Sequence, residues 1–136
     1  MDVAFLAAKV LFSAAWRADS GLARLWDLTG TELVTSAYAA EEARRNLERP
    51  EQGIRLAQLL GSVRIVPEVE APPGWDALGL PDKDWPILLS ASAAGATHLL
   101  TGDLRHFGAI LGKRVGGLLI LRPVDYLRSV TGSRSR

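Results

Sequence analysis

Short, wholly apolar runs alternate along the chain with stretches in which apolar residues return every three or four positions. The runs are typical of strands that are buried on both faces of a parallel sheet. They predict strands at residues 3–6, 33–35, 63–66, 97–101 and 118–121. The periodic stretches predict helices between them, because that spacing places apolar side chains on one helix face. We therefore predict an α/β fold, a three-layer α/β/α sandwich around a mainly parallel sheet of four or five strands.

Capping residues and helix breakers indicate where the helices begin. Ser36 can accept a hydrogen bond from the first turn of a helix, and Pro50 suits the start of the next one. Pro123 opens a C-terminal helix in the same way. In the helix after Pro50, we expect Ile54, Leu56, Leu59 and Leu60 to face the core. We also predict a helix between Asp82 and Gly95, and the other helices are predicted at residues 9–16, 21–28, 37–47 and 51–60.

The length of 136 residues suits one domain, which we expect to span residues 1–130 and to be followed by a frayed tail at 131–136. Cysteine is absent, which agrees with a reducing cytoplasm. The apolar start contains Asp2 and Lys9, so it is better explained as a strand entering a helix than as a signal peptide. No apolar run approaches the roughly 20 residues needed to cross a bilayer. We therefore predict a cytoplasmic protein without membrane contact.

The charge balance and the sequence motifs exclude few function classes. Sixteen basic and 15 acidic residues leave a net charge of +1, which does not by itself indicate nucleic-acid binding. No glycine-rich phosphate loop is found, so a phosphatase or nucleotide-binding domain is the weakest candidate. His98 lies within an expected strand and is predicted to be a packed, hydrogen-bonded histidine. His106 follows Asp103 by three residues and can position the acidic loop or a phosphate.

Acidic residues near the ends of predicted strands are the best candidates for a site. Asp103 follows the fourth predicted strand, and Asp84 lies in the first turn of the helix before that strand. Glu42 lies on the helix after the second strand. The carboxyl ends of parallel strands meet at one edge of the sheet, where such folds place ligands. Carboxylates that converge there are suited to Mg²⁺ or Mn²⁺. Asp82 is the alternate for Asp84, because both lie at the same helix start.

Three stretches of the chain together resemble a bacterial PIN domain. They are VAFLAAKVLFSAA at residues 3–15, TSAYAAEEARRNL at 35–47 and DKDWPILLSASAAGATHLLTGDLRHFG at 82–108. The resemblance covers nearly the whole chain, and its most specific part is Asp-x-Pro-Ile-Leu followed by Thr-Gly-Asp-x-x-His-Phe-Gly. It implies a small parallel sheet flanked by helices, and an acidic cluster that binds Mg²⁺ or Mn²⁺ for hydrolysis of RNA.

The same resemblance implies roles for individual residues. Glu42, Asp84 and Asp103 match the family's second, third and fourth acidic positions, which bind the metal and catalyse cleavage. Thr101 matches a hydroxyl residue beside the last of them. Many PIN domains are toxins of toxin–antitoxin pairs. RNA is therefore the implied substrate, and an antitoxin protein and a second copy of the chain are the candidate protein partners.

The chain departs from the family at the first acidic position. The family pattern Phe-Leu-Asp-Ala-Asn-Val-Leu is similar to residues 5–11, except that Ala7 replaces the acid and Lys9 replaces the asparagine. Loss of a carboxylate weakens the oxygen cage, and a nearby ammonium repels a divalent cation. We expect metal affinity and cleavage to be impaired, while Lys9 neutralises Glu42 or Asp103 or contacts a phosphate. The alternative is a catalytically silent PIN-like module that binds RNA or a partner protein.

Overall fold

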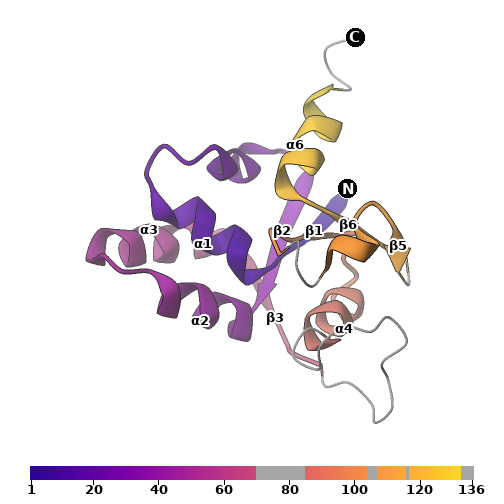
Figure 1. Ribbon diagram of the computed structural model, residues 1–136, viewed down its shortest axis with the longest axis horizontal. Helices are drawn as coiled ribbons and strands as arrows, with labels where there is room; N and C mark the ends of the chain where they lie inside the picture. Colours follow the sequence, from indigo (N-terminus) through magenta and orange to yellow (C-terminus); the bar gives the residue numbers. More distant parts are fainter. Residues whose placement is uncertain (70–84, 104–106, 116, 133–136) are drawn as a thin grey trace.

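The computed structural model describes residues 1–69, 85–103, 107–115 and 117–132. Within these residues, helices pack against a six-stranded sheet (Figure 1). The strands are β1 (Asp2–Leu6), β2 (Thr31–Ser36), β3 (Arg64–Val66), β4 (His98–Leu100), β5 (Arg114–Val115) and β6 (Leu118–Leu121). The helices are α1 (Ala8–Trp16), α2 (Ala37–Asn46), α3 (Pro50–Leu60), α4 (Trp85–Ala93) and α6 (Pro123–Gly132), with 3-10 helices η1 (Gly21–Asp27) and η3 (Gly108–Ile110).

The strand order across the sheet is β3-β2-β1-β4-β6-β5. Every neighbouring pair is parallel except β5 and β6, so the prediction of an α/β fold with a mainly parallel sheet is confirmed. The predicted count of four or five strands is wrong, because β5 adds a two-residue strand at one edge. Arg114 and Val115 form no apolar run that would predict it. Gly117, with a φ of +83°, occurs in the connection to β6, a backbone conformation that favours glycine.

Apolar side chains of β1 alternate between two separate cores. Ala4 and Leu6 belong to one core with buried residues of α1, α2 and α3, whereas Phe5 belongs to the other with Leu88 and Ala91 of α4. This alternation follows from the two-residue repeat of a strand. In Figure 1, α1, α2 and α3 lie together on one side of the sheet and α4 lies on the other. Helices therefore cover both faces of the sheet, which is compatible with a three-layer sandwich.

Observed strand limits differ from the predicted ones by one or two residues. β2 begins at Thr31 rather than at residue 33, because Thr31 and Glu32 pair with β1 through their backbones, whatever their side chains. β4 is shorter than predicted. Thr97 lies just before it. Its backbone N donates to the carbonyl of Val3 at 2.8 Å, and its hydroxyl accepts a hydrogen bond from the backbone N of Val3 at 2.9 Å.

Most helix starts and ends agree with the predicted capping residues. The Ser36 hydroxyl accepts a hydrogen bond from the backbone N of Ala39 at 3.1 Å, and Pro50 is the first residue of α3. Gly95 follows α4 with a φ of +76°, the left-handed conformation common just after a helix. The segment predicted as a helix at 21–28 is the 3-10 helix η1. Its seven residues are held by the Ser20 cap and by Trp26, whose indole donates to the carbonyl of Leu59 at 2.9 Å.

The predicted inward face of α3 is partly wrong. Leu56 is buried as expected, but Ile54 is 61% exposed. Gln52 is instead only 3% exposed, and its amide donates to the carbonyl of Trp16 at 3.2 Å. Its side-chain oxygen accepts a hydrogen bond from the backbone N of Arg49 at 2.9 Å. A polar residue therefore faces inward here because partners from other segments satisfy its hydrogen bonds.

The beginnings of β1, β2 and β4, here called the amino edge of the sheet, carry a polar network around the buried Tyr126 of α6. The Tyr126 hydroxyl lies 2.6 Å from the Thr31 hydroxyl and donates to the Asp2 carboxylate at 2.8 Å. The His98 ring packs edge-on against the Tyr126 ring, with centroids 4.8 Å apart. His98 Nδ1 lies 2.8 Å from the Thr97 hydroxyl. The prediction that His98 is a packed, hydrogen-bonded residue is confirmed.

Burial controls the protonation of this network. It raises the pKa of Tyr126 to about 12; the hydrogen bond with Thr31 opposes this effect, and Asp2 reinforces it. Burial also lowers the pKa of His98, which the Asp2 carboxylate opposes and the Arg114 guanidinium reinforces. The neutral forms of both rings are therefore favoured in the folded chain.

At the carboxyl end of the chain, α6 continues through Gly132 and so includes part of the predicted frayed tail. The Thr131 hydroxyl donates to the Leu127 carbonyl at 2.7 Å. Residues 133–136 lie outside the described residues. No helix in the described part of the chain is long and apolar enough to span a membrane.

Candidate functional site

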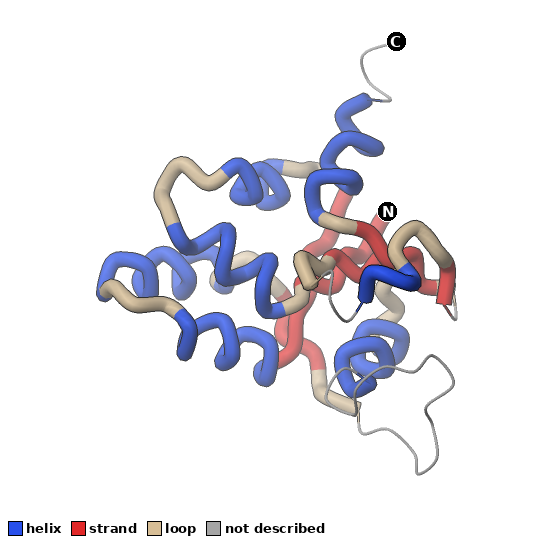
Figure 2. The backbone as a smooth tube through the Cα atoms, in the orientation of Figure 1, coloured by secondary structure: helices blue, strands red, loops and turns tan. Residues whose placement is uncertain are grey.

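The strand order creates a switch point between β1 and β4. From β1 the chain adds β2 and then β3 on one side, and β4 lies on the other side of β1. Figure 2 shows the strands in red between the blue helices. In open α/β sheets, the connections at such a point leave in opposite directions and open a crevice at the carboxyl ends of the strands. The segments that begin at Ala7 and at Thr101 leave β1 and β4 at this place.

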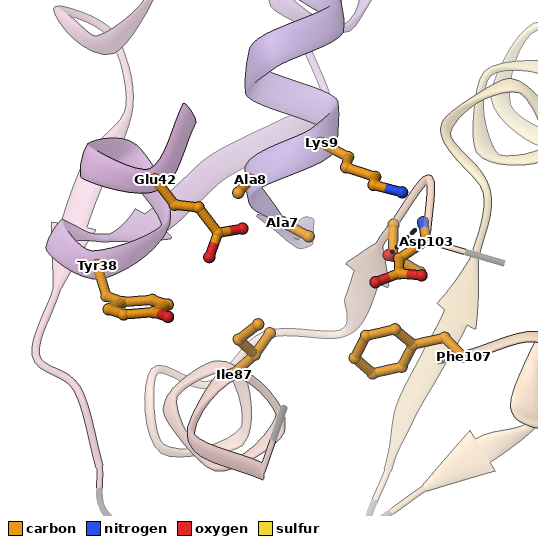
Figure 3. A pocket seen from close by; sticks show the side chains of 9 residues that line it. Ala7, Ala8, Lys9, Tyr38, Glu42, Ile87, Asp103 and Phe107 are labelled. Atoms are coloured by element: carbon orange, nitrogen blue, oxygen red, sulfur yellow. Dashed lines mark hydrogen bonds between the residues drawn. The ribbon is translucent and has the colours of Figure 1, made fainter. Parts of the chain in front are cut away.

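A small pocket of about 60 Å³ lies at this carboxyl edge. It has room for roughly four groups the size of water. Figure 3 shows the carboxylates of Glu42 and Asp103 pointing into it from two sides, with the methyl group of Ala7 between them. The residues that line the pocket are Ala7, Ala8, Lys9, Tyr38, Glu42, Ile87, Thr101, Asp103 and Phe107.

The start of α1 places Ala7 and Lys9 at the pocket. Ala7 caps α1 without a side-chain hydrogen bond, and its backbone N donates to the carbonyl of Leu100 at 3.0 Å. This bond joins the ends of β1 and β4. Ala7 is only 5% exposed, and the Lys9 side chain extends towards the side of the pocket where Asp103 lies (Figure 3). A Cβ placed on Gly102 would lie 3.6 Å from the Cβ of Lys9, so the two segments approach closely.

The turn after β4 positions Asp103. The buried Thr101 hydroxyl accepts a hydrogen bond from the backbone N of Asp103 at 3.0 Å. The Asp103 carbonyl accepts another from the backbone N of Phe107 at 3.1 Å. Thr101 thus supports the acidic turn, and the Asp103 side chain is half-buried beside the pocket.

Glu42 reaches the pocket from α2, the helix that directly follows β2. Its side chain is half-buried, and it makes no hydrogen bond or ion pair with any residue that the structure describes. A carboxylate in this setting keeps its oxygens available to a ligand. Glu42 is 61 residues before Asp103 in the sequence, yet both border the same small pocket.

The predicted site residues are brought together only in part. Glu42, Asp103, Ala7, Lys9 and Thr101 all line the pocket. Asp84, its alternate Asp82 and His106 lie outside the described residues. Among residues 1–69, 85–103, 107–115 and 117–132, no group of three or more acidic or histidine side chains is placed to hold a metal ion.

Four further lining residues, Ala8, Tyr38, Ile87 and Phe107, are not among those predicted from the sequence. Tyr38 precedes Glu42 by four residues on α2, so helical spacing places both on one face. That spacing is a signal by which Tyr38 could be found. Ile87 and Phe107 belong to the apolar core beneath the pocket and form its wall.

The donor set can be compared with the needs of a divalent cation. Mg²⁺ commonly takes one or two carboxylates from a protein and completes its shell with water and substrate phosphates. Glu42 and Asp103 meet that requirement. Lys9 opposes it, because its exposed side chain extends to the side of the pocket where Asp103 lies, and an ammonium there repels a cation. The described residues therefore supply two carboxylates and one ammonium at this pocket.

Comparison with models of known protein families and with curated proteins finds no match.

Proposed function

We propose that the chain is a PIN-like ribonuclease, related to the toxins of toxin–antitoxin pairs, that hydrolyses RNA with Mg²⁺ or Mn²⁺ at reduced activity. The observation that best supports this proposal is the convergence of Glu42 and Asp103, distant in sequence, on one pocket at the switch point of the sheet. The resemblance of residues 82–108 to the family motif agrees with it.

In this proposal, each side chain has a distinct task. Glu42 and Asp103 hold the cation, and Thr101 keeps the turn that carries Asp103 in place. Ile87 and Phe107 limit the access of water from below. A bound divalent cation supplies Lewis-acid polarisation of the phosphate and a lowered pKa of an attacking water.

Ala7 and Lys9 account for the reduced activity. The methyl group of Ala7 stands where a further carboxylate would complete the oxygen cage, and the ammonium of Lys9 offsets one of the two negative charges at the pocket. The substitution Ala7→Asp together with Lys9→Asn makes the local charge more negative by two. We expect it to raise Mn²⁺ affinity at least tenfold and to increase cleavage. Lys9→Asn alone should raise affinity less, since it removes repulsion without adding a ligand.

The test is a Mn²⁺ titration by calorimetry, together with cleavage of a generic single-stranded RNA. The matched control is Ala109→Asp with Lys113→Asn, which makes the same charge change at two exposed residues that do not line the pocket. The control should leave Mn²⁺ affinity unchanged. Robust cleavage by the unmodified chain, abolished by Asp103→Asn, would show that activity is not reduced.

A second candidate function is the silent PIN-like module that binds RNA or a partner protein. The specific observation in its favour is that an alanine methyl and a lysine occupy the pocket beside the two acids. If the double variant binds Mn²⁺ but cleaves no RNA, this candidate replaces the first. An antitoxin-like reading frame beside the gene would favour the toxin.

A further inference from the structure

Tyr38 is an exposed aromatic residue at the mouth of the pocket. Its side chain is 42% exposed, and Figure 3 shows its ring at the side of the pocket opposite Asp103, below Glu42. Its backbone is fixed, because its N–H donates to a carboxylate oxygen of Glu68 at 2.5 Å. Among the described residues, no hydrogen bond to the Tyr38 hydroxyl is found. A large apolar face is thus held in solvent beside charged groups.

A groove of about 330 Å³ adjoins the pocket along α1 and α2. The groove and the pocket share Ala8, Lys9 and Glu42, so Lys9 stands where the two meet. The pocket alone, at about 60 Å³, is too small for a nucleobase but has room for the oxygens of a phosphate. A polymer with its phosphate in the pocket must therefore place its bases outside, beside Tyr38 on one side and in the groove on the other. The groove is lined by Ala8, Lys9, Phe12, Glu42, Ala43 and Asn46.

Resting on the proposed function, we propose that Tyr38 stacks on a base of single-stranded RNA and that Lys9 holds the phosphate next to that base. The substrate class is a single strand rather than a duplex, because stacking on a side chain needs a base face that is not covered by its neighbours. The Lys9 ammonium then attracts the phosphate, which a weakly bound cation would attract less. The strand continues from the pocket into the groove between α1 and α2.

The experiment measures binding of a fluorescent six-nucleotide RNA by anisotropy, in EDTA and at low salt. Tyr38→Ala should weaken binding about tenfold, as expected for loss of one stacked base. Tyr38→Phe keeps the ring and should bind like the unmodified chain. An oligonucleotide of the same length without bases should bind weakly, and equally so to Tyr38→Ala and to the unmodified chain.

The contribution of Lys9 has its own measurement. Lys9→Ala should weaken binding and reduce the slope of log affinity against log salt by about 0.7, the value for one phosphate contact with a single strand. Lys113→Ala removes the same charge at an exposed residue that does not line the pocket and should leave the slope unchanged. Thermal melting of each variant, followed by circular dichroism, checks that the fold is intact.

Several outcomes would overturn the inference. These are unchanged affinity in a folded Tyr38→Ala variant, equal losses for Tyr38→Ala with base-bearing and base-free strands, or no RNA binding by the unmodified chain. Because binding is measured without metal, an unchanged Tyr38→Ala variant leaves the cleavage proposal standing. Absence of Mn²⁺-dependent cleavage in the double variant overturns the cleavage proposal and leaves the stacking result intact.

Discussion

The amino and carboxyl edges of the sheet carry polar side chains that are held in different ways. At the amino edge, Tyr126 bonds to Asp2 and lies within hydrogen-bonding distance of Thr31, and its ring contacts His98. At the carboxyl edge, the side chain of Glu42 has no partner within the part of the chain that the structure describes and faces a pocket. Polar groups that hydrogen-bond to one another stabilise a fold, whereas a carboxylate that faces a pocket is available to a ligand. The difference separates a stabilising edge from a candidate functional one.

The largest expected effect on stability is at the amino edge. Tyr126→Phe removes one hydroxyl that bridges two polar partners, and we expect it to lower the free energy of unfolding by about 1 to 2 kcal/mol. The folded-state pKa of Tyr126 is raised above its ordinary value of 10, so its contribution is fully present below pH 10 and is lost as the pH rises towards 12. Urea denaturation at pH 7 and pH 11 measures both effects. If the variant and the unmodified chain lose stability equally above pH 10, the Tyr126 network does not act as described.

A smaller effect is expected from His98. Its folded-state pKa is lowered, so the neutral ring contributes stability that is present above the ordinary value of 6.5 and is lost as the pH falls below it. His98→Gln should therefore lose less stability between pH 7 and pH 5 than the unmodified chain does. Urea denaturation at the two pH values makes the comparison. An identical acid-induced loss in both proteins would contradict the role of burial at this ring.

The smallest effect on stability is expected at the carboxyl edge, from Glu42→Gln. Because the side chain has no partner among the described residues, the free energy of unfolding should change by no more than about 0.5 kcal/mol. Cleavage by the Ala7→Asp and Lys9→Asn double variant should nevertheless fall at least tenfold, since one cation ligand is lost. A large loss of stability would show that Glu42 supports the fold and would remove the contrast between the edges.

Elements with a strong local pattern could be predicted from the sequence. The strand at 118–121 and the helix capped by Ser36 depend on side chains within a few residues of one another, and both are observed. Gln52 and Ile54 show the limit. The inward place of Gln52 depends on the Trp16 carbonyl, 36 residues away, and no local pattern encodes that contact. β5 likewise exists only because β6 pairs with it.

The candidate site shows the same limit in another form. Glu42 and Asp103 could be predicted to converge because each follows a strand of one parallel sheet, and strand ends meet at one edge. Tyr38 could not be predicted as part of the site from its own residue type, since an aromatic residue on a helix is more often part of a core. Its exposure depends on how α2 lies beside the pocket, which is a property of packing.

The central position of β1 also has a consequence for how the chain is made. β1 can pair with β2 once residue 36 is available, but its other edge pairs with β4, whose last residue is 100. Synthesis of those 64 intervening residues takes roughly 3 to 13 s at about 5 to 20 residues per second. During that interval, the nascent chain leaves one side of an apolar strand without its native neighbour, which is a template for pairing with other chains. Pairing of β1 with β2 during synthesis therefore covers only one of the two hydrogen-bonding edges of β1.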